Sequence, residues 1–293
     1  TRCLSDWSSD VCSSDLYSPD ELARNLDLMR AANITWVRQM VRWDEIEPSA
    51  GTYDWERWDA IIAAFEGDPS LKLIPVLVGS PAWARPANDS VFAPPDDPID
   101  FANFTRAFAE RYGHVIDSYQ IWDEPNLYAA WGGEPRAADY LAMLSAAYTA
   151  IHAADSGAAV IAAALAPTTE QGPENISDWQ YLDDLLALGG ARFMDADASK
   201  PYGFDSPTED RTVSENALNC SRISGLREIL ETHHAGQMPL WASKWGWNAL
   251  QGEWQGAESI WGQVSPQQQV EYTLAALDRV EREWPWLSSM ILY

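Results

Sequence analysis

The feature that most constrains the fold is a regular alternation, from Ser18 to Tyr293, of segments with a helical apolar period and short apolar runs. Helices are predicted near 18–32, 55–66, 98–112, 137–154, 179–188, 221–234 and 266–283. Strands are predicted near 35–41, 71–78, 118–122, 159–164, 196–200, 240–245 and 287–293. Strands this apolar are buried on both faces, which indicates a parallel sheet flanked by helices.

The alternation predicts an α/β chain of the (β/α)8 TIM barrel class. A closed barrel needs eight strands, and only seven are recognisable. We expect the first strand just before Ser18 and a last strand that is cut off at Tyr293, so the barrel is predicted to be truncated at both ends. No repeat or linker interrupts residues 17–293, which are therefore predicted to form one domain.

Residues 1–16 are treated separately from the predicted domain. The stretch from Asp6 to Leu16 resembles the translation of a sequencing-library adapter, as found in metagenomic fragments, and it has no hydrophobic period. We interpret residues 1–16 as a non-native segment and exclude them from the fold. Cys220 is then the only cysteine of the domain, which leaves no disulfide framework. Secretion and a cytoplasmic location both stay open.

Composition limits the partners. The formal charge of -25 and the pI near 4.3 disfavour nucleic acids and anionic membrane surfaces. No apolar run reaches the roughly 18 residues needed to cross a bilayer. The chain contains 16 tryptophans. The broad apolar face of an indole can stack on a sugar ring, although most of these tryptophans are expected in the core. We therefore expect a monomer that binds a neutral carbohydrate, with no metal and no cofactor.

Two distant segments carry the chemistry: Ile121-Trp122-Asp123-Glu124-Pro125-Asn126 and Leu240-Trp241-Ala242-Ser243-Lys244-Trp245-Gly246-Trp247. Together they resemble the catalytic strand ends of the clan A glycoside hydrolases, which include cellulase-like family 5 and xylosidase-like family 39. In that pattern Asn-Glu-Pro supplies the acid/base and Thr-Glu-x-Gly-Trp supplies the nucleophile. The resemblance covers residues 17–293 and implies an O-glycosyl hydrolase acting on β-glycosidic bonds. Glu124 is the implied acid/base.

Lys244 stands where the resemblance calls for the nucleophilic carboxylate. A retaining site places two carboxyl groups about 5–5.5 Å apart, and the second attacks the anomeric carbon. A protonated amine is not nucleophilic, and it favours the ionised form of Glu124 over the proton-donating form. Asp123 is a second departure, because Asn is usual there and donates a hydrogen bond that Asp cannot donate. The sequence as written is therefore expected to hydrolyse glycosides slowly.

Further residues fit the resemblance as substrate-binding or site-orienting groups. Arg38 matches an arginine that orients the nucleophile, Tyr202 matches a tyrosine that hydrogen-bonds it, and Lys200 stands where His often precedes Pro-Tyr. The remaining candidates lie after predicted strands and are expected either to contact sugar or, for each tryptophan, to pack in the core: Trp43, Trp83, Asn126, Trp131 and Trp247.

Three functional hypotheses remain from the sequence. The first is a hydrolase that uses Glu124, with a missing nucleophile that is either restored in the true gene or replaced by Asp197 or Glu170 acting through water. The second is a catalytically silent barrel, a pseudoenzyme that binds carbohydrate. The third is an unrelated barrel enzyme forming a Schiff base through Lys244, which the Trp-x-Glu-Pro-Asn segment disfavours.

Overall fold

A computed structural model describes residues 19–67, 70–86, 90–250, 252, 254–256 and 259–292. The strands are β1 (Trp36–Arg42), β2 (Lys72–Val78), β3 (Ser118–Ile121), β4 (Ala159–Ile161), β5 (Asp197–Ser199), β6 (Leu240–Trp245) and β7 (Leu287–Leu292). The helices are α1 (Pro19–Ala31), α2 (Trp43–Ile46), α3 (Glu56–Phe65), α4 (Pro98–Tyr112), α5 (Tyr128–Trp131), α6 (Ala137–Ala154), α7 (Asp178–Ala187), α8 (Ile223–Thr232) and α9 (Pro266–Glu283), with short 3-10 turns η1 (Gly190–Phe193) and η2 (Cys220–Arg222).

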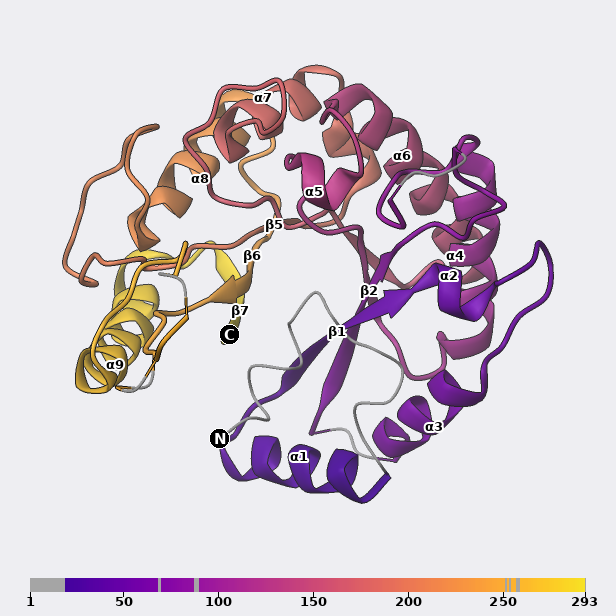
Figure 1. Cartoon of the computed structure of the whole chain (residues 1–293), viewed down its shortest axis with the longest axis horizontal. Coiled ribbons are helices and arrows are strands. Elements are labelled where there is room, and N and C mark those ends of the chain that lie inside the picture. Colours follow the sequence, from indigo (N-terminus) through magenta and orange to yellow (C-terminus); the bar gives the residue numbers. More distant parts are fainter. Residues whose placement is uncertain are drawn as a thin grey trace.

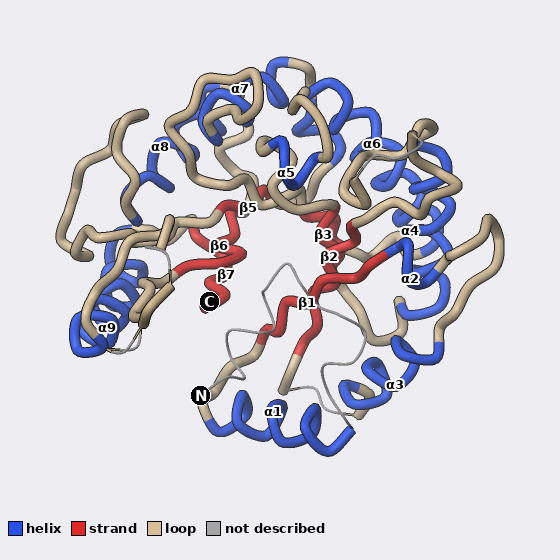
Figure 2. Tube along the Cα trace, in the orientation of Figure 1, coloured by secondary structure: helices blue, strands red, loops and turns tan. Residues whose placement is uncertain are grey.

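The strands form two parallel sheets that follow chain order. One sheet runs β1-β2-β3-β4 and the other β5-β6-β7. Parallel bridges from Ile161 to Ala196 and from Leu165 to Ser199 connect the neighbouring edges of the two sheets. The strands therefore form one inner arc with the helices outside it (Figure 1; Figure 2). This confirms the predicted α/β class with a parallel sheet.

Apolar residues fill both sides of this arc. On the inner side, Trp36 of β1, Trp241 of β6 and Ile291 of β7 pack against one small cluster, so the first and last strands share an interior. The Trp36 and Trp241 rings meet edge to face at 5.2 Å between centroids. On the outer side, a larger cluster joins the strands to the helices, as expected for strands buried on both faces.

The helices and strands lie close to their predicted positions. α4, α6, β6 and α9 have the predicted bounds, and the other predicted helices and strands within the described residues shift by a few residues at their ends. Capping chemistry sets some of these bounds, because the Ser265 side chain accepts from Gln268 N and Pro266 occupies the first turn of α9. The one-turn helices α2 and α5 were not predicted. The expected strand before Ser18 and the adapter-like segment lie outside the described residues.

One buried arginine joins two loops to the outer helices. Arg222 donates to both carboxylate oxygens of Asp178 at the start of α7, with its closest contact at 2.7 Å. Its guanidinium also donates to Ser177 and to the following backbone carbonyls: Thr168, Ser214, Glu215 and Ala217. Because Arg222 is fully covered, these contacts replace water for nearly all its donors. The loops before α7 and η2 are therefore fixed by one side chain.

None of the helices among the described residues is long and apolar enough to span a membrane.

We predict that Arg222→Met lowers the free energy of unfolding by about 3–5 kcal/mol, because it leaves the Asp178 carboxylate buried without its partner. Urea denaturation measures the loss. Arg106→Ala is the control, since Arg106 pairs with Glu110 on the exposed face of α4 and is expected to cost less than about 0.5 kcal/mol. Equal losses in the two variants would show that the Arg222 cluster does not hold the loops.

Candidate active site

A buried cluster of charged side chains joins Arg38, from within β1, to residues at the carboxyl ends of β3 and β5. Arg38 of β1 donates to Gln120 Oε1 at 3.0 Å and to Asp123 Oδ1 at 2.7 Å. Lys200, directly after β5, donates from Nζ to Asp123 Oδ2 at 2.8 Å and to Glu124 Oε1 at 2.5 Å. These contacts bring together Arg38, Asp123, Glu124 and Lys200, which the sequence analysis had placed in one site.

The backbone at the end of β3 is twisted to present the two carboxylates. Trp122 and Glu124 have positive φ of 68° and 52°, a conformation that costs a bulky residue about 1–3 kcal/mol. The bonds from Trp122 N to the Leu77 carbonyl and from Glu124 N to the Ala164 carbonyl hold it, each at 3.0 Å. This twist breaks the strand alternation, so Asp123 lies on the same side as Gln120.

Electrostatics keep the central pair ionised. Burial would raise the pKa of Asp123, but the charges of Arg38, Lys200 and Lys244 outweigh it and hold that pKa well below its usual range. Burial would lower the pKa of Lys200, but Asp123 and Glu124 outweigh it and raise that pKa. Lys200 is therefore a buried ammonium that bonds both carboxylates.

Lys244 reaches the same cluster through an irregularity in β6. The pairing of β6 with β7 shifts register between Ala242 and Trp245, and both of these residues belong to a further apolar cluster, which includes Ala276 of α9, although they are three positions apart. A bulge of this kind turns the intervening side chains inward. Ser243 Oγ accordingly donates to Gln120 Oε1 at 3.2 Å, and the Lys244 charge lowers the pKa of Asp123. Lys244 is itself only 4% exposed.

Three of the proposed sugar-stacking tryptophans are covered by protein, so their assignment as substrate contacts is corrected. Trp43 is fully buried, stacks on Phe104 at 5.6 Å, and donates to Glu47. Trp131 is buried between other aromatic rings. Trp247 is buried and donates to the Ser206 carbonyl at 2.7 Å. Their large apolar surfaces pack against other protein groups, and core packing was the alternative expected for each of them from the sequence.

Asn126 is also a structural residue rather than a substrate contact. Its Nδ2 donates to the carbonyls of Ala166 and Ile176 at 2.9 Å each, and its Oδ1 accepts from Ala166 N at 2.9 Å. A fully buried amide with these three bonds has little capacity left for a sugar hydroxyl. Asn126 instead fixes the loop after β4 and the 171–176 turn beside the β3 end.

Trp83 and Tyr202 differ in how much of their surface remains open. Trp83 is partly exposed, with its Nε1 donating to the Glu47 carbonyl at 2.9 Å. Tyr202 is buried, and its ring meets the exposed Trp261 edge to face at 6.5 Å between centroids.

Sequence reasoning missed Trp261, because it lies some fifteen residues beyond β6 and no strand-end motif marks it.

The two substitute bases suggested by the sequence lie outside the cluster. Asp197 lies one position from Ala196 and Ala198, which face the interior, so alternation turns its side chain toward the helices. Burial raises the pKa of Asp197 to about 7. Glu170 lies on an exposed loop and accepts from Asn175 Nδ2 at 3.0 Å. Neither residue contacts Glu124.

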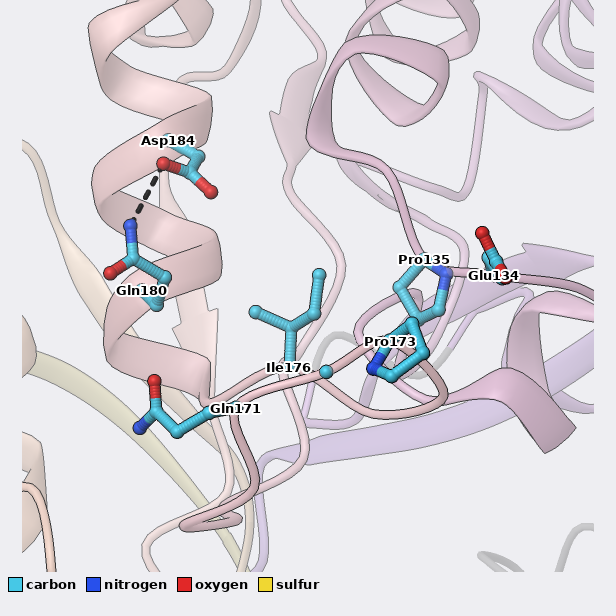
Figure 3. A pocket seen from close by; sticks show the side chains of 8 residues that line it. Glu134, Pro135, Gln171, Pro173, Ile176, Gln180 and Asp184 are labelled. Carbon is cyan, nitrogen blue, oxygen red and sulfur yellow. Dashed lines mark hydrogen bonds between the residues drawn. The ribbon is translucent and has the colours of Figure 1, made fainter.

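A separate open groove of about 490 Å³ lies beside α7 (Figure 3). Its walls come from the α7 surface, the 171–176 turn and the segment before α6, and they include Glu134, Gln171, Pro173, Gln180 and Asp184. Gln180 donates to Asp184 at 2.9 Å across one helical turn. The charged cluster contributes no residue to it, so the groove is not the site defined by Glu124.

Among the described residues, no group of three or more His, Cys, Asp and Glu side chains is arranged to hold a metal ion. The acidic residues Asp123 and Glu124 are instead bonded to cationic side chains.

Known proteins with the same fold hydrolyse glycosides. The model of glycoside hydrolase family 42, described as beta-galactosidase, matches residues 15–92. Comparison with curated protein sequences gives no match. A family 39 glycoside hydrolase structure from the gut symbiont Bacteroides cellulosilyticus WH2 has a TM-score of 0.68 and 19% identity, covering 94% of this chain and 55% of its own.

Two further structures agree. A glucosidase from Croceicoccus marinus has a TM-score of 0.65 and 14% identity, covering 92% of this chain and 55% of its own. A monomeric beta-xylosidase from Caulobacter crescentus CB15 has a TM-score of 0.65 and 16% identity, with coverages of 94% and 56%. This chain spans a little over half the length of these proteins. The predicted resemblance to the clan A glycoside hydrolases is confirmed, and at these identities the solved structures establish the fold.

We predict that stability falls as pH rises from about 4 to about 7 because of Asp197. Its carboxyl has a pKa of about 7 in the fold and 3.8 as a free group, so the unfolded chain loses this proton first. The contribution is full below about pH 4 and is lost by pH 8, a change on the order of 4 kcal/mol. Asp197→Asn should remove this slope in urea titrations at several pH values. Parallel pH profiles for the parent and the variant would contradict the assignment.

Proposed function

We propose that this chain is a (β/α)8 glycosidase domain that binds neutral β-linked oligosaccharides at the strand ends and uses Glu124 as its acid/base. The observation that carries the proposal is the position of Glu124, three residues beyond the end of β3, in a cluster built from residues in or just after β1, β3, β5 and β6. Active sites of such barrels lie at this end of the strands. The similarity to glycoside hydrolase structures supports a glycosidase function.

Support for the barrel comes from topology. The strands follow chain order, every hydrogen-bonded pair of strands in the described part of the chain is parallel, and β1 and β7 contribute to the same inner cluster. An eighth strand between β1 and β7 would close the wall. The helices cover the outer side, as a barrel requires (Figure 1).

Glu124 has the access that an acid/base needs. Its side chain is 20% exposed, while Asp123 is 5% exposed and shared between Arg38 and Lys200. A substrate oxygen can therefore approach Glu124 but not Asp123. As acid, Glu124 would protonate the leaving glycosidic oxygen, and as base it would take a proton from the incoming water.

The same contacts explain why hydrolysis by this sequence should be slow. Lys200 Nζ donates to Glu124 Oε1 at 2.5 Å and so occupies one of the two oxygens that would face the leaving group. Lys244 brings a positive charge where an oxocarbenium-like transition state would need a negative one. These two cations are also the specific observation that favours the second candidate function, a silent domain that binds carbohydrate without cleaving it.

We predict that Lys244→Glu raises hydrolysis of nitrophenyl β-glycosides above the parent rate. The new carboxylate would supply the second acidic group beside Arg38, whose charge favours its ionised form. Adding Glu124→Gln to this variant should lower its rate by about 100- to 10,000-fold, the usual contribution of an acid/base. A panel of glucosides, xylosides, galactosides and mannosides measures the rates.

Lys72→Glu is the matched control, because it makes the same charge change on an exposed side chain. Lys72 is the first residue of β2 and so lies at the amino ends of the strands, away from Glu124. Its rate should equal that of the parent. If Lys244→Glu is no faster than Lys72→Glu while both bind oligosaccharide, the silent binding domain is the correct function.

A further inference from the structure

An exposed indole packs against Tyr202 in the loop that follows Lys200. Trp261, in the segment after β6, is 41% exposed, and its ring meets Tyr202 edge to face. Tyr202 N donates to the Lys200 carbonyl at 2.8 Å, so this tyrosine, two residues further along, is hydrogen-bonded to the backbone of the residue that bonds Glu124. Tyr202 also meets Phe204 edge to face at 6.3 Å. A row of aromatic contacts therefore leads from the backbone of Lys200 through the buried Tyr202 to the exposed Trp261.

The backbone that carries Trp261 is fixed against the loop after β5. Asp205 Oδ1 accepts from Gln263 N at 2.7 Å, and Asn248 Nδ2 donates to the Gly262 carbonyl at 3.1 Å. Gly262 has a φ of 71°, and a Cβ there would lie 2.7 Å from the carbonyl carbon of Phe204. The two loops thus touch at backbone level, and Trp261 is presented by a preorganised support.

The loop after β5 is itself anchored below this contact. Gly203 N donates to the Gly246 carbonyl at 2.9 Å, and a Cβ on Gly203 would lie 1.9 Å from the Trp247 ring. Trp247 and Gly203 therefore interlock, which explains why Trp247 is buried. The covered tryptophan supports the loop, and the exposed one is left free for a ligand.

We propose that Trp261, backed by Tyr202, is a subsite that stacks on a sugar ring of a neutral β-linked oligosaccharide adjoining the ring held at Glu124. This inference rests on the proposed function and adds the residue that recognises a second sugar. A flat indole with an apolar face fits the C–H face of a pyranose. The neighbouring Asp205 carboxylate and the overall charge of -25 disfavour an acidic sugar.

The test measures dissociation constants of cello- and xylo-oligosaccharides of one to four units for the full chain by titration calorimetry. Trp261→Ala should weaken binding of the longer sugars by about five- to tenfold, an aromatic contact's usual size. Single-unit sugars should bind as in the parent. Trp261→Leu keeps apolar bulk without the flat face and should show the same length-dependent loss. Trp254→Ala is the matched control, since Trp254 is 54% exposed in the same segment.

The outcomes separate this inference from the function on which it rests. If the parent binds oligosaccharides and both Trp261 variants bind every length as the parent does, the subsite is wrong while the carbohydrate site stands. An equal loss in Trp254→Ala would also overturn it. If the folded parent binds no neutral oligosaccharide, the proposed function fails and the subsite with it. Thermal melts of each variant show whether folding is retained.

Discussion

The site depends on one buried ion-pair system, in which the Lys200 ammonium bonds the carboxylates of Asp123 and Glu124. The contact joins the ends of β3 and β5, which belong to different sheets. Charges removed from water require partners, and here Arg38 supplies the remaining one to Asp123. The geometry around Glu124 is therefore set by electrostatic balance among side chains on several strands rather than by β3 alone.

Breaks in regular strand geometry direct these side chains. The positive φ values at Trp122 and Glu124 and the bulge in β6 both occur where charged residues meet. Such departures cost free energy, and neighbouring backbone hydrogen bonds hold them in place. Deeper in the sheets, apolar alternation prevails and supplies most of the packing. The fold therefore keeps its irregular backbone at the end of the strands where chemistry is proposed.

Most of the fold could be predicted from the sequence, since apolar periods and caps placed the long helices and β6 correctly. The cluster of Arg38, Asp123, Glu124 and Lys200 was also predictable, because Asp123, Glu124 and Lys200 lie at predicted strand ends and Arg38 lies within a predicted strand. For Trp43, Trp131 and Trp247 the sequence left sugar contact and core packing as alternatives, because an indole after a strand can face either layer and only three-dimensional packing decides. The structural role of Asn126 and the exposed position of Trp261 beside Tyr202 were not predicted, for a related reason. Their partners lie in loops distant in sequence, where no periodicity operates.

The bulge in β6 has a consequence for how such a protein changes over evolutionary time. Ala242 and Trp245 anchor β6 in the apolar cluster shared with α9, so apolar packing holds the strand on both sides of position 244. Lysine and glutamate codons differ by a single base. Exchange at this position is therefore one mutational step that changes the charge of a buried side chain between two apolar anchors. The two functions proposed for this site, cleaving a glycan and binding it without cleavage, are thus separated by one base change.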